Sequence, residues 1–297
     1  MKARIKEIVL DKYILEIIDT QEEITASIRG ITKKKNSILV GDLVEVEKSY
    51  DRYMIEKVLD RKNSLIRPPV ANIDNLVIVV SLANPKPDFF LLDKQIVLCV
   101  SKKINPIIVI NKVDLNLTEK TKSDISYIRD VYIKLGIKVI EVSSKEGIGI
   151  DILKKSLKNK ISAFSGNSGV GKSSIINSIF NNKINQAIVS DVARKTNRGK
   201  HTTKHVRIYK DEGMYILDTP GFSSYELYDV EYKQLKEFYP DFQELKCEYL
   251  DCNHVNESFD VCKVKQAVDK NLIDKDRYNR YIELFSKLKE KDDKKYK

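Results

Sequence analysis

The sequence predicts three consecutive units: a small β-barrel, an α/β domain with a mostly parallel sheet, and a helical metal-binding domain. Short β-rich runs alternate with polar turns over residues 1–65. Continuous apolar runs then alternate with helical patterns over residues 66–225, around a glycine-rich loop. Three of the four cysteines are crowded into the last unit, residues 226–297. A chain of 297 residues is long enough for several domains with their own cores.

The first unit has the pattern of an OB-fold-like barrel. Five short strands favour a small closed Greek-key barrel. We expect these strands at Glu7–Leu10, Tyr13–Ile18, Ile24–Ile28, Leu43–Val46 and Met54–Val58. Barrels of this kind often bind RNA or DNA on one face. The unit is nearly neutral, so a docking module and a direct RNA contact both stay open.

The second unit begins after Arg67-Pro68-Pro69, which we interpret as a linker. Its apolar runs are uninterrupted, as in strands buried on both faces, and helical patterns separate them. The predicted strands are Leu76–Val80, Pro106–Ile110, Lys138–Val142, Lys160–Phe164, His205–Tyr209 and Met214–Leu217. The predicted helices are Phe89–Ser101, Lys120–Leu135, Ile150–Leu157 and Ser174–Phe180. Ligands of such sheets bind at the carboxyl ends of the strands.

A phosphate-binding loop follows the fourth of these strands. Gly166-Asn167-Ser168-Gly169-Val170-Gly171-Lys172-Ser173 matches G-x-x-x-x-G-K-[ST], and Ser174 continues into a helix. The glycines let backbone N–H groups converge on phosphate, and the start of the helix adds its positive dipole end. We expect Lys172 to reach the β- and γ-phosphates as a catalytic residue, and the Ser173 hydroxyl to hold Mg²⁺.

Two further loops are expected to bind guanine. Asn111-Lys112-Val113-Asp114 follows the second strand of the sheet. An aspartate placed there accepts hydrogen bonds from N1–H and the N2 amino group of guanine, whereas adenine offers no such pair of donors. Asn111 and the stem of Lys112 would frame the ring, and Ser143-Ser144-Lys145 would support the base from the other side. Together with the phosphate loop, these motifs indicate a GTPase.

The switch segments of such a GTPase can also be assigned. Asp218-Thr219-Pro220-Gly221 ends the last strand; Asp218 would hold Mg²⁺ through water, and the Gly221 N–H would sense the γ-phosphate. Either Thr202 or Thr203 would supply the other switch ligand to Mg²⁺, and the sequence does not decide between them. Phe222 stands where many GTPases have a glutamine that orients the attacking water, so intrinsic hydrolysis should be slow. His201 is the nearest substitute for that glutamine.

The last unit carries a metal-ligand pattern. Cys247-x4-Cys252-x-His254-x7-Cys262 offers three thiols and one imidazole, which suit a closed tetrahedral structural Zn²⁺ site. In a chain without an export signal, this crowding favours metal over disulfides. Cys99 stands apart on an apolar helix and should be a core residue. Beyond the cluster, residues 276–289 have a helical pattern with one apolar side.

The order of the nucleotide motifs is unusual, because N-K-x-D and the serine loop precede the phosphate loop. The same sheet can form from a chain that is opened at another point. With an OB-like unit before it and a Cys/His cluster after it, this order closely resembles the circularly permuted GTPases of the RsgA (YjeQ) family. Ala71-Asn72-Ile73-Asp74, Gly199-Lys200-His201-Thr202-Thr203 and the zinc spacing are also similar to that family's motifs.

The resemblance implies a bacterial factor that binds the small ribosomal subunit and its rRNA, assists late maturation of the subunit and leaves after GTP hydrolysis. It also implies one zinc ion on the four ligands above and a role for His201 in hydrolysis.

Charge independently favours an RNA partner. The formal net charge is +10, and the run Arg194–Lys210 contains seven basic residues and no acidic one. A solvated basic loop is the alternative. No signal peptide or membrane span is evident, since the longest apolar stretch is Leu76–Ala83. We therefore expect a cytoplasmic monomer without membrane contact that binds GTP and GDP.

Three functions compete at this point. The first is a GTPase enzyme, and the second is an RNA-docking module whose nucleotide is structural. GTP turnover that rises with added small subunits would distinguish the first from the second. A small-molecule kinase is disfavoured, because no separate acceptor pocket is evident and Asp114 favours guanine.

Overall fold

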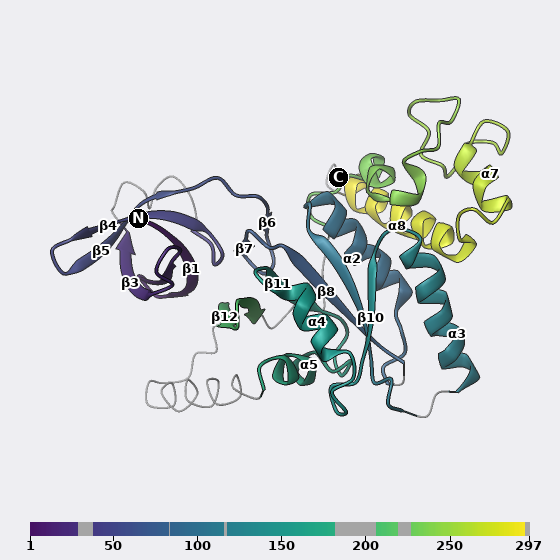
Figure 1. Cartoon of the computed structure of the whole chain (residues 1–297). Coiled ribbons are helices and arrows are strands. Elements are labelled where there is room, and N and C mark those ends of the chain that lie inside the picture. The colour runs from purple at the N-terminus through teal and green to yellow at the C-terminus, as the bar shows by residue number, and fades with distance from the viewer. Residues whose placement is uncertain (29–37, 83, 116–117, 182–205, 219–226, 295–297) are drawn as a thin grey trace.

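The computed structural model describes residues 1–28, 38–82, 84–115, 118–181, 206–218 and 227–294. The barrel lies at one end, the α/β unit in the middle and the helical C-terminal unit against the far side of the α/β unit (Figure 1). Within these ranges, no helix combines the length and the apolar character needed to cross a bilayer.

The first five strands close into a barrel. They are β1 (Lys2–Val9), β2 (Lys12–Ile17), β3 (Glu23–Ile28), β4 (Leu43–Ser49) and β5 (Arg52–Val58). β1, β2 and β3 pair in sequence, β5 pairs with β3 in parallel, and β4 closes the ring by pairing with both β5 and β1. Alternate side chains, Ile5, Leu15 and Ile55 among them, fill the interior. The predicted OB-like barrel is confirmed.

The first strand begins earlier than the sequence suggested, at Lys2 rather than Glu7. Ala3 and Ile5 are buried while Arg4 and Lys6, which alternate with them, are only partly buried, so the segment is a half-buried strand despite its charge.

Arg67-Pro68-Pro69 is the turn of a short hairpin rather than an extended linker. The hairpin is formed by β6 (Ser64–Leu65) and β7 (Val70–Ala71). The buried Asn63 side chain accepts from the backbone N–H of Ile73 at 2.9 Å and donates to its carbonyl at 2.8 Å. The connection between the barrel and the α/β unit is therefore fixed by hydrogen bonds.

The α/β unit contains six strands in the order β10-β9-β8-β11-β13-β12. They are β8 (Asn75–Ser81), β9 (Asn105–Asn111), β10 (Lys138–Val142), β11 (Ile161–Ser165), β12 (Arg207–Asp211) and β13 (Met214–Asp218). All pairs are parallel except β12 with β13. β12 also pairs with β1 of the barrel, Glu7 opposite Arg207, so one sheet continues from the α/β unit into the barrel.

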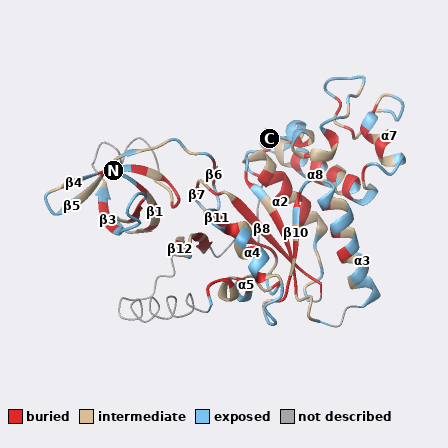
Figure 2. Cartoon of the chain, viewed as in Figure 1, coloured by how far each residue is buried: buried red, intermediate tan, exposed pale blue. Residues whose placement is uncertain are grey.

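Helices cover both faces of this sheet, whose central strands are buried (Figure 2). They are α2 (Phe89–Ser101), α3 (Glu119–Ile128), α4 (Ile150–Leu157) and α5 (Lys172–Ile179). Alternate strand residues pack either with α4 and α5 or with α2 and α3. The predicted helix Lys120–Leu135 is confirmed over most of its length, but its second part is π-helical: η1 (Arg129–Ile133) follows α3 directly. That turn carries Tyr132 into the core, where its hydroxyl donates to Asp93 at 2.9 Å.

The C-terminal unit packs on the outer side of α2 (Figure 1). It contains the 3-10 helices η2 (Tyr232–Phe238) and η3 (Pro240–Phe242) and the helices α7 (Lys263–Asp269) and α8 (Lys275–Asp293). Its side chains and those of α2 belong to one apolar cluster.

A buried ion cluster reinforces this contact. Arg277 of α8 is 1% exposed and bonds to Asp93 of α2 and to Asp241, and Arg280 Nε lies 2.5 Å from Asp93. Buried charges are tolerated when they are paired in this way, and removing one partner is costly.

We expect Asp93→Asn to lower the free energy of unfolding by about 3 kcal/mol, because it leaves the Arg277 guanidinium buried without its main counter-charge. Asp229→Asn, which removes an exposed partner of Lys102, should cost less than about 1 kcal/mol. Urea unfolding followed by circular dichroism measures both values. Equal losses in the two variants would contradict the importance of the buried cluster.

Candidate nucleotide and metal sites

The predicted nucleotide loops meet at one edge of the sheet. The loops begin at the carboxyl ends of the parallel strands β9, β10 and β11, which are all on the same edge. β13 is parallel to β11 and ends at Asp218 on this edge. The other switch residues, His201, Thr202, Thr203 and Gly221, lie outside the described residues, as does the side chain of Asp218.

The phosphate loop has the close contacts that require glycine. Gly166 has φ +135°, and a Cβ there would lie 2.2 Å from the Val79 carbonyl oxygen. Gly171 has φ +96°, and a Cβ there would lie 2.2 Å from Asn111 Nδ2. Both glycines have positive φ, and other atoms already fill the space that a Cβ would need. Any side chain at either position would therefore displace the loop.

Lys172 lies within this loop. It is the first residue of α5, and its Nζ donates to the carbonyls of Gly166 at 2.7 Å and Asn167 at 2.9 Å. Burial lowers the pKa of Lys172. The ammonium group therefore lies inside the curve of the backbone, where it can neutralise phosphate charge. Ser173 and Ser174 are exposed in the first turn of α5, where a hydroxyl can reach a ligand.

The predicted guanine loop, residues 111–114, is hydrogen-bonded to the phosphate loop. Asn111 is buried, and its Nδ2 donates to the Val170 carbonyl at 2.9 Å. Lys112 Nζ donates to the Gly169 carbonyl at 2.9 Å and to the Asn84 carbonyl at 2.6 Å. These bonds set the distance between the two loops, although 57 and 59 residues of sequence separate the bonded pairs.

The loop at residues 143–145, also predicted to contact the base, lies against Asp114. A hydrogen bond from Ser143, with a smaller contribution from the charge of Lys145, lowers the pKa of Asp114. The carboxylate is therefore ionised at neutral pH, as an acceptor for guanine must be. Ser178 of α5 donates to the Ser144 carbonyl at 2.9 Å, which ties this loop to the helix that follows the phosphate loop.

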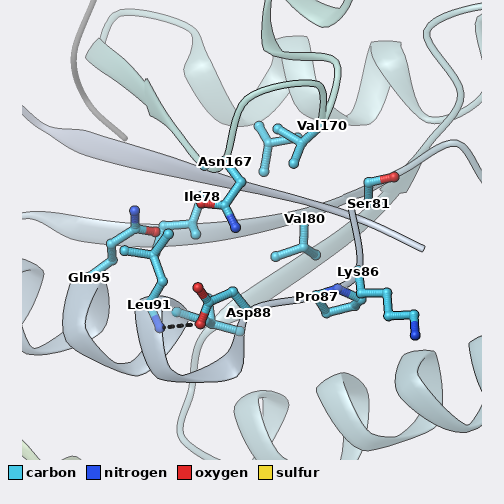
Figure 3. A pocket seen from close by; sticks show the side chains of 13 residues that line it. Ile78, Val80, Ser81, Lys86, Pro87, Asp88, Leu91, Gln95, Asn167 and Val170 are labelled. Atoms are coloured by element: carbon cyan, nitrogen blue, oxygen red, sulfur yellow. Dashed lines mark hydrogen bonds between the residues drawn. The ribbon is translucent and has the colours of Figure 1, made fainter. Parts of the chain in front are cut away.

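A small pocket lies between β8, the start of α2 and the phosphate loop (Figure 3). Its polar side chains include Lys86, Asp88, Gln95 and Asn167. Sequence reasoning missed Gln95, since a single glutamine within an apolar helix matches no motif.

The cysteines and the histidine of the last unit converge as predicted. Their ligand atoms lie within 4.8 Å of one another. His254 Nδ1 lies 3.5, 3.3 and 3.6 Å from the sulfurs of Cys247, Cys252 and Cys262. One ring nitrogen cannot hydrogen-bond three thiols at once, but an S···N edge of about 3.5 Å is what tetrahedral Zn²⁺ geometry requires. The four side chains therefore fit one such ion.

Neighbouring groups hold the ligand loop in place. Glu257 accepts from the backbone N–H groups of Asn253 at 2.7 Å and Val255 at 2.9 Å. The Tyr278 hydroxyl donates to the His254 carbonyl at 2.5 Å. Outer bonds of this kind orient metal ligands.

Burial also sets the protonation of the ligands. It lowers the pKa of His254 to about 4, with a smaller effect from Lys236, so the imidazole is neutral and can accept a metal. It raises the pKa of Cys252 to about 12, so a bound ion must displace a proton from this thiol. Cys99, predicted to be a core residue, is fully buried on α2.

We expect Gly171→Ala to weaken GDP binding at least about tenfold, because the new methyl group pushes the phosphate loop away from Asn111. Gly136→Ala is the matched control: Gly136 also has positive φ, at +74°, but nothing lies within 4 Å of the added carbon. Fluorescence titration measures both affinities. Equal losses would show that the lost affinity is not specific to the contact between Gly171 and Asn111.

The Cys/His cluster predicts the zinc content of the purified chain and of its cysteine variants. The purified chain should contain one zinc ion, and Cys262→Ser should lose it and increase hydrogen exchange in α7. Cys99→Ser should keep the zinc, because that thiol is not one of the ligands. Elemental analysis and hydrogen exchange measure these properties, and full zinc content in Cys262→Ser would disprove the assignment.

Comparisons with known proteins agree with this geometry. The family model described as RsgA GTPase matches residues 58–228. The "Small ribosomal subunit biogenesis GTPase RsgA" of Caldanaerobacter subterraneus subsp. tengcongensis is 42% identical over 275 residues, which cover 91% of this chain and 90% of that protein. The Thermotoga maritima protein of the same name is 39% identical over 273 residues, with coverage of 91% and 90%.

Solved structures show the same architecture. YjeQ from Thermotoga maritima superposes with a TM-score of 0.84 at 34% identity, covering 97% of this chain and 98% of that one. YloQ, described as a circularly permuted GTPase, gives a TM-score of 0.80 at 30% identity, with coverage of 98% and 95%. The domain architecture, the permuted order of the motifs and these similarities lead to one conclusion: the chain belongs to the RsgA family of circularly permuted GTPases.

Proposed function

We propose that this protein is a GTPase that binds the small ribosomal subunit, assists its late maturation and leaves after GTP hydrolysis. One observation carries the proposal that the protein binds GTP. Asn111 and Lys112 donate hydrogen bonds to carbonyls of the phosphate loop, which supports a single pocket for base and phosphates. The printed names of the relatives support the ribosomal part.

The proposed GTP site combines four loops. Asp114 reads the guanine edge, and Lys172 neutralises charge on the β- and γ-phosphates during transfer to water. The proposed GTP-binding residues are Asn111, Lys112, Val113, Asp114, Ser143, Ser144, Lys145, Gly166, Asn167, Ser168, Gly169, Val170, Gly171, Lys172, Ser173, Ser174 and Gly221.

Mg²⁺ and the attacking water need further groups. The exposed Ser173 hydroxyl, Asp218 and one of Thr202 and Thr203 are the proposed Mg²⁺ ligands. When bound, the ion would neutralise the charge that develops on the phosphates. His201 is the proposed group that orients the water, in place of the glutamine that Phe222 replaces.

We divide the chain into a barrel (1–65), a GTPase domain (66–225) and a zinc domain (226–297) that binds one structural zinc. The separate core of the barrel supports the first boundary. The basic run 194–210 suits contact with rRNA, and a cytoplasmic monomer suits assembly with a single subunit.

Turnover measurements test this function. GTP hydrolysis should be slow for the isolated chain and rise sharply with added small subunits, and His201→Ala should lose most of the rise while keeping GDP affinity. Phosphate release assays measure the rates. Absence of stimulation would support instead an RNA-docking module with a structural nucleotide, and unchanged stimulation in His201→Ala would remove that residue from the mechanism.

A further inference from the structure

Helix α2 is packed between the phosphate loop and the zinc domain. Residues two positions apart on a helix point about 200° apart, so Asp93 and Gln95 face opposite sides. On one side, Gln95 Nε2 donates to Ser165 Oγ at 2.6 Å, and both side chains are fully buried. Ser165 is the last residue of β11 and directly precedes Gly166 of the phosphate loop. Gln95 therefore holds the base of this loop.

On its other side, α2 is held by the zinc domain. Asp93 is 1% exposed and accepts hydrogen bonds from Arg277, from Arg280 at 2.5 Å and from the Tyr132 hydroxyl at 2.9 Å. Both arginines belong to α8. A movement of α8 relative to the sheet would therefore move α2, because a buried ion cluster does not stretch without cost.

An apolar side chain could fill the space that Gln95 occupies, so packing alone does not explain its polar amide. Its Oε1 is buried and has no hydrogen-bond partner among the described residues, although the side chain lines the pocket beside Asn167 (Figure 3). A buried acceptor without a partner lowers stability, and an apolar side chain of the same length would avoid that loss. The amide is thus better explained by its bond to Ser165 than by packing.

We propose that Gln95 is a positioning residue for the phosphate loop, and that Asp93 makes this position sensitive to the docking of the zinc domain. The inference deepens the proposed function and rests on the phosphate loop binding GTP. Coupling of this kind is reciprocal: a contact that shifts the zinc domain changes nucleotide affinity, and bound nucleotide changes how the zinc domain is held.

The first test uses the full zinc-loaded chain without ribosomal subunits. Gln95→Met should weaken GDP binding about threefold to tenfold, the range for one lost hydrogen bond. The ratio of GDP to inosine diphosphate affinity should stay unchanged, because that ratio reports on Asp114 and not on the phosphates. Gln95→Asn, whose shorter amide cannot reach Ser165, should lose the same affinity.

Gln234→Met is the matched control, since it makes the same chemical change at an exposed position of η2, and its GDP affinity should equal that of the unmodified chain. Unchanged GDP affinity in Gln95→Met, or a changed nucleotide ratio, would overturn the positioning role.

The second test probes the link to the zinc domain. Arg280→Gln should weaken GDP binding about twofold in the unmodified chain and have no further effect in Gln95→Met, since coupled residues are not additive. Independent, additive losses would overturn the link. Neither test involves ribosomal subunits, so failure here is distinct from failure of the proposed function, which would appear as absent stimulation of turnover.

Discussion

The constraint on which this structure depends is the pair of hydrogen bonds that joins the guanine loop to the phosphate loop. Asn111 and Lys112 donate to the carbonyls of Val170 and Gly169, so the loops predicted to hold the base and the phosphates lie at a fixed distance from each other. Parallel strands bring both loops to one sheet edge whatever their order along the chain. The permuted order therefore leaves the arrangement of these loops unchanged, because that arrangement depends on contacts across the sheet and not on sequence proximity.

Permutation changes instead what is attached to the sheet. The barrel precedes β8 in the sequence. Its strand β1 pairs with β12, the last strand on one side of the α/β sheet. The buried Glu16 of the barrel accepts from Tyr215 at 2.8 Å and pairs with Lys210 at 3.1 Å, so charge and hydrogen bonding reinforce that junction. At the other side, α8 and its arginines hold α2. The sheet that carries the predicted nucleotide-binding loops is thus attached to a domain on each side.

The sequence predicted the features that have a local signature. Glycine spacing located the phosphate loop, uninterrupted apolar runs located strands such as β8 and β9, and ligand spacing located the cluster around His254. Contacts between distant segments had no such signature. Arg277 and Asp93 are 184 residues apart, and nothing in the sequence distinguishes either residue from an exposed charged side chain. Gln95 was missed for the same reason. Its proposed role depends on its contact with Ser165 at the end of β11, which lies far away in the sequence.

The central claim is that separate loops form one pocket specific for guanine nucleotides, and isothermal titration calorimetry of the purified chain tests it most directly. The account predicts a single site for GDP and for a non-hydrolysable GTP analogue, with no measurable heat from ADP or an ATP analogue under the same conditions. Equal affinity for guanosine and adenosine nucleotides would contradict the account.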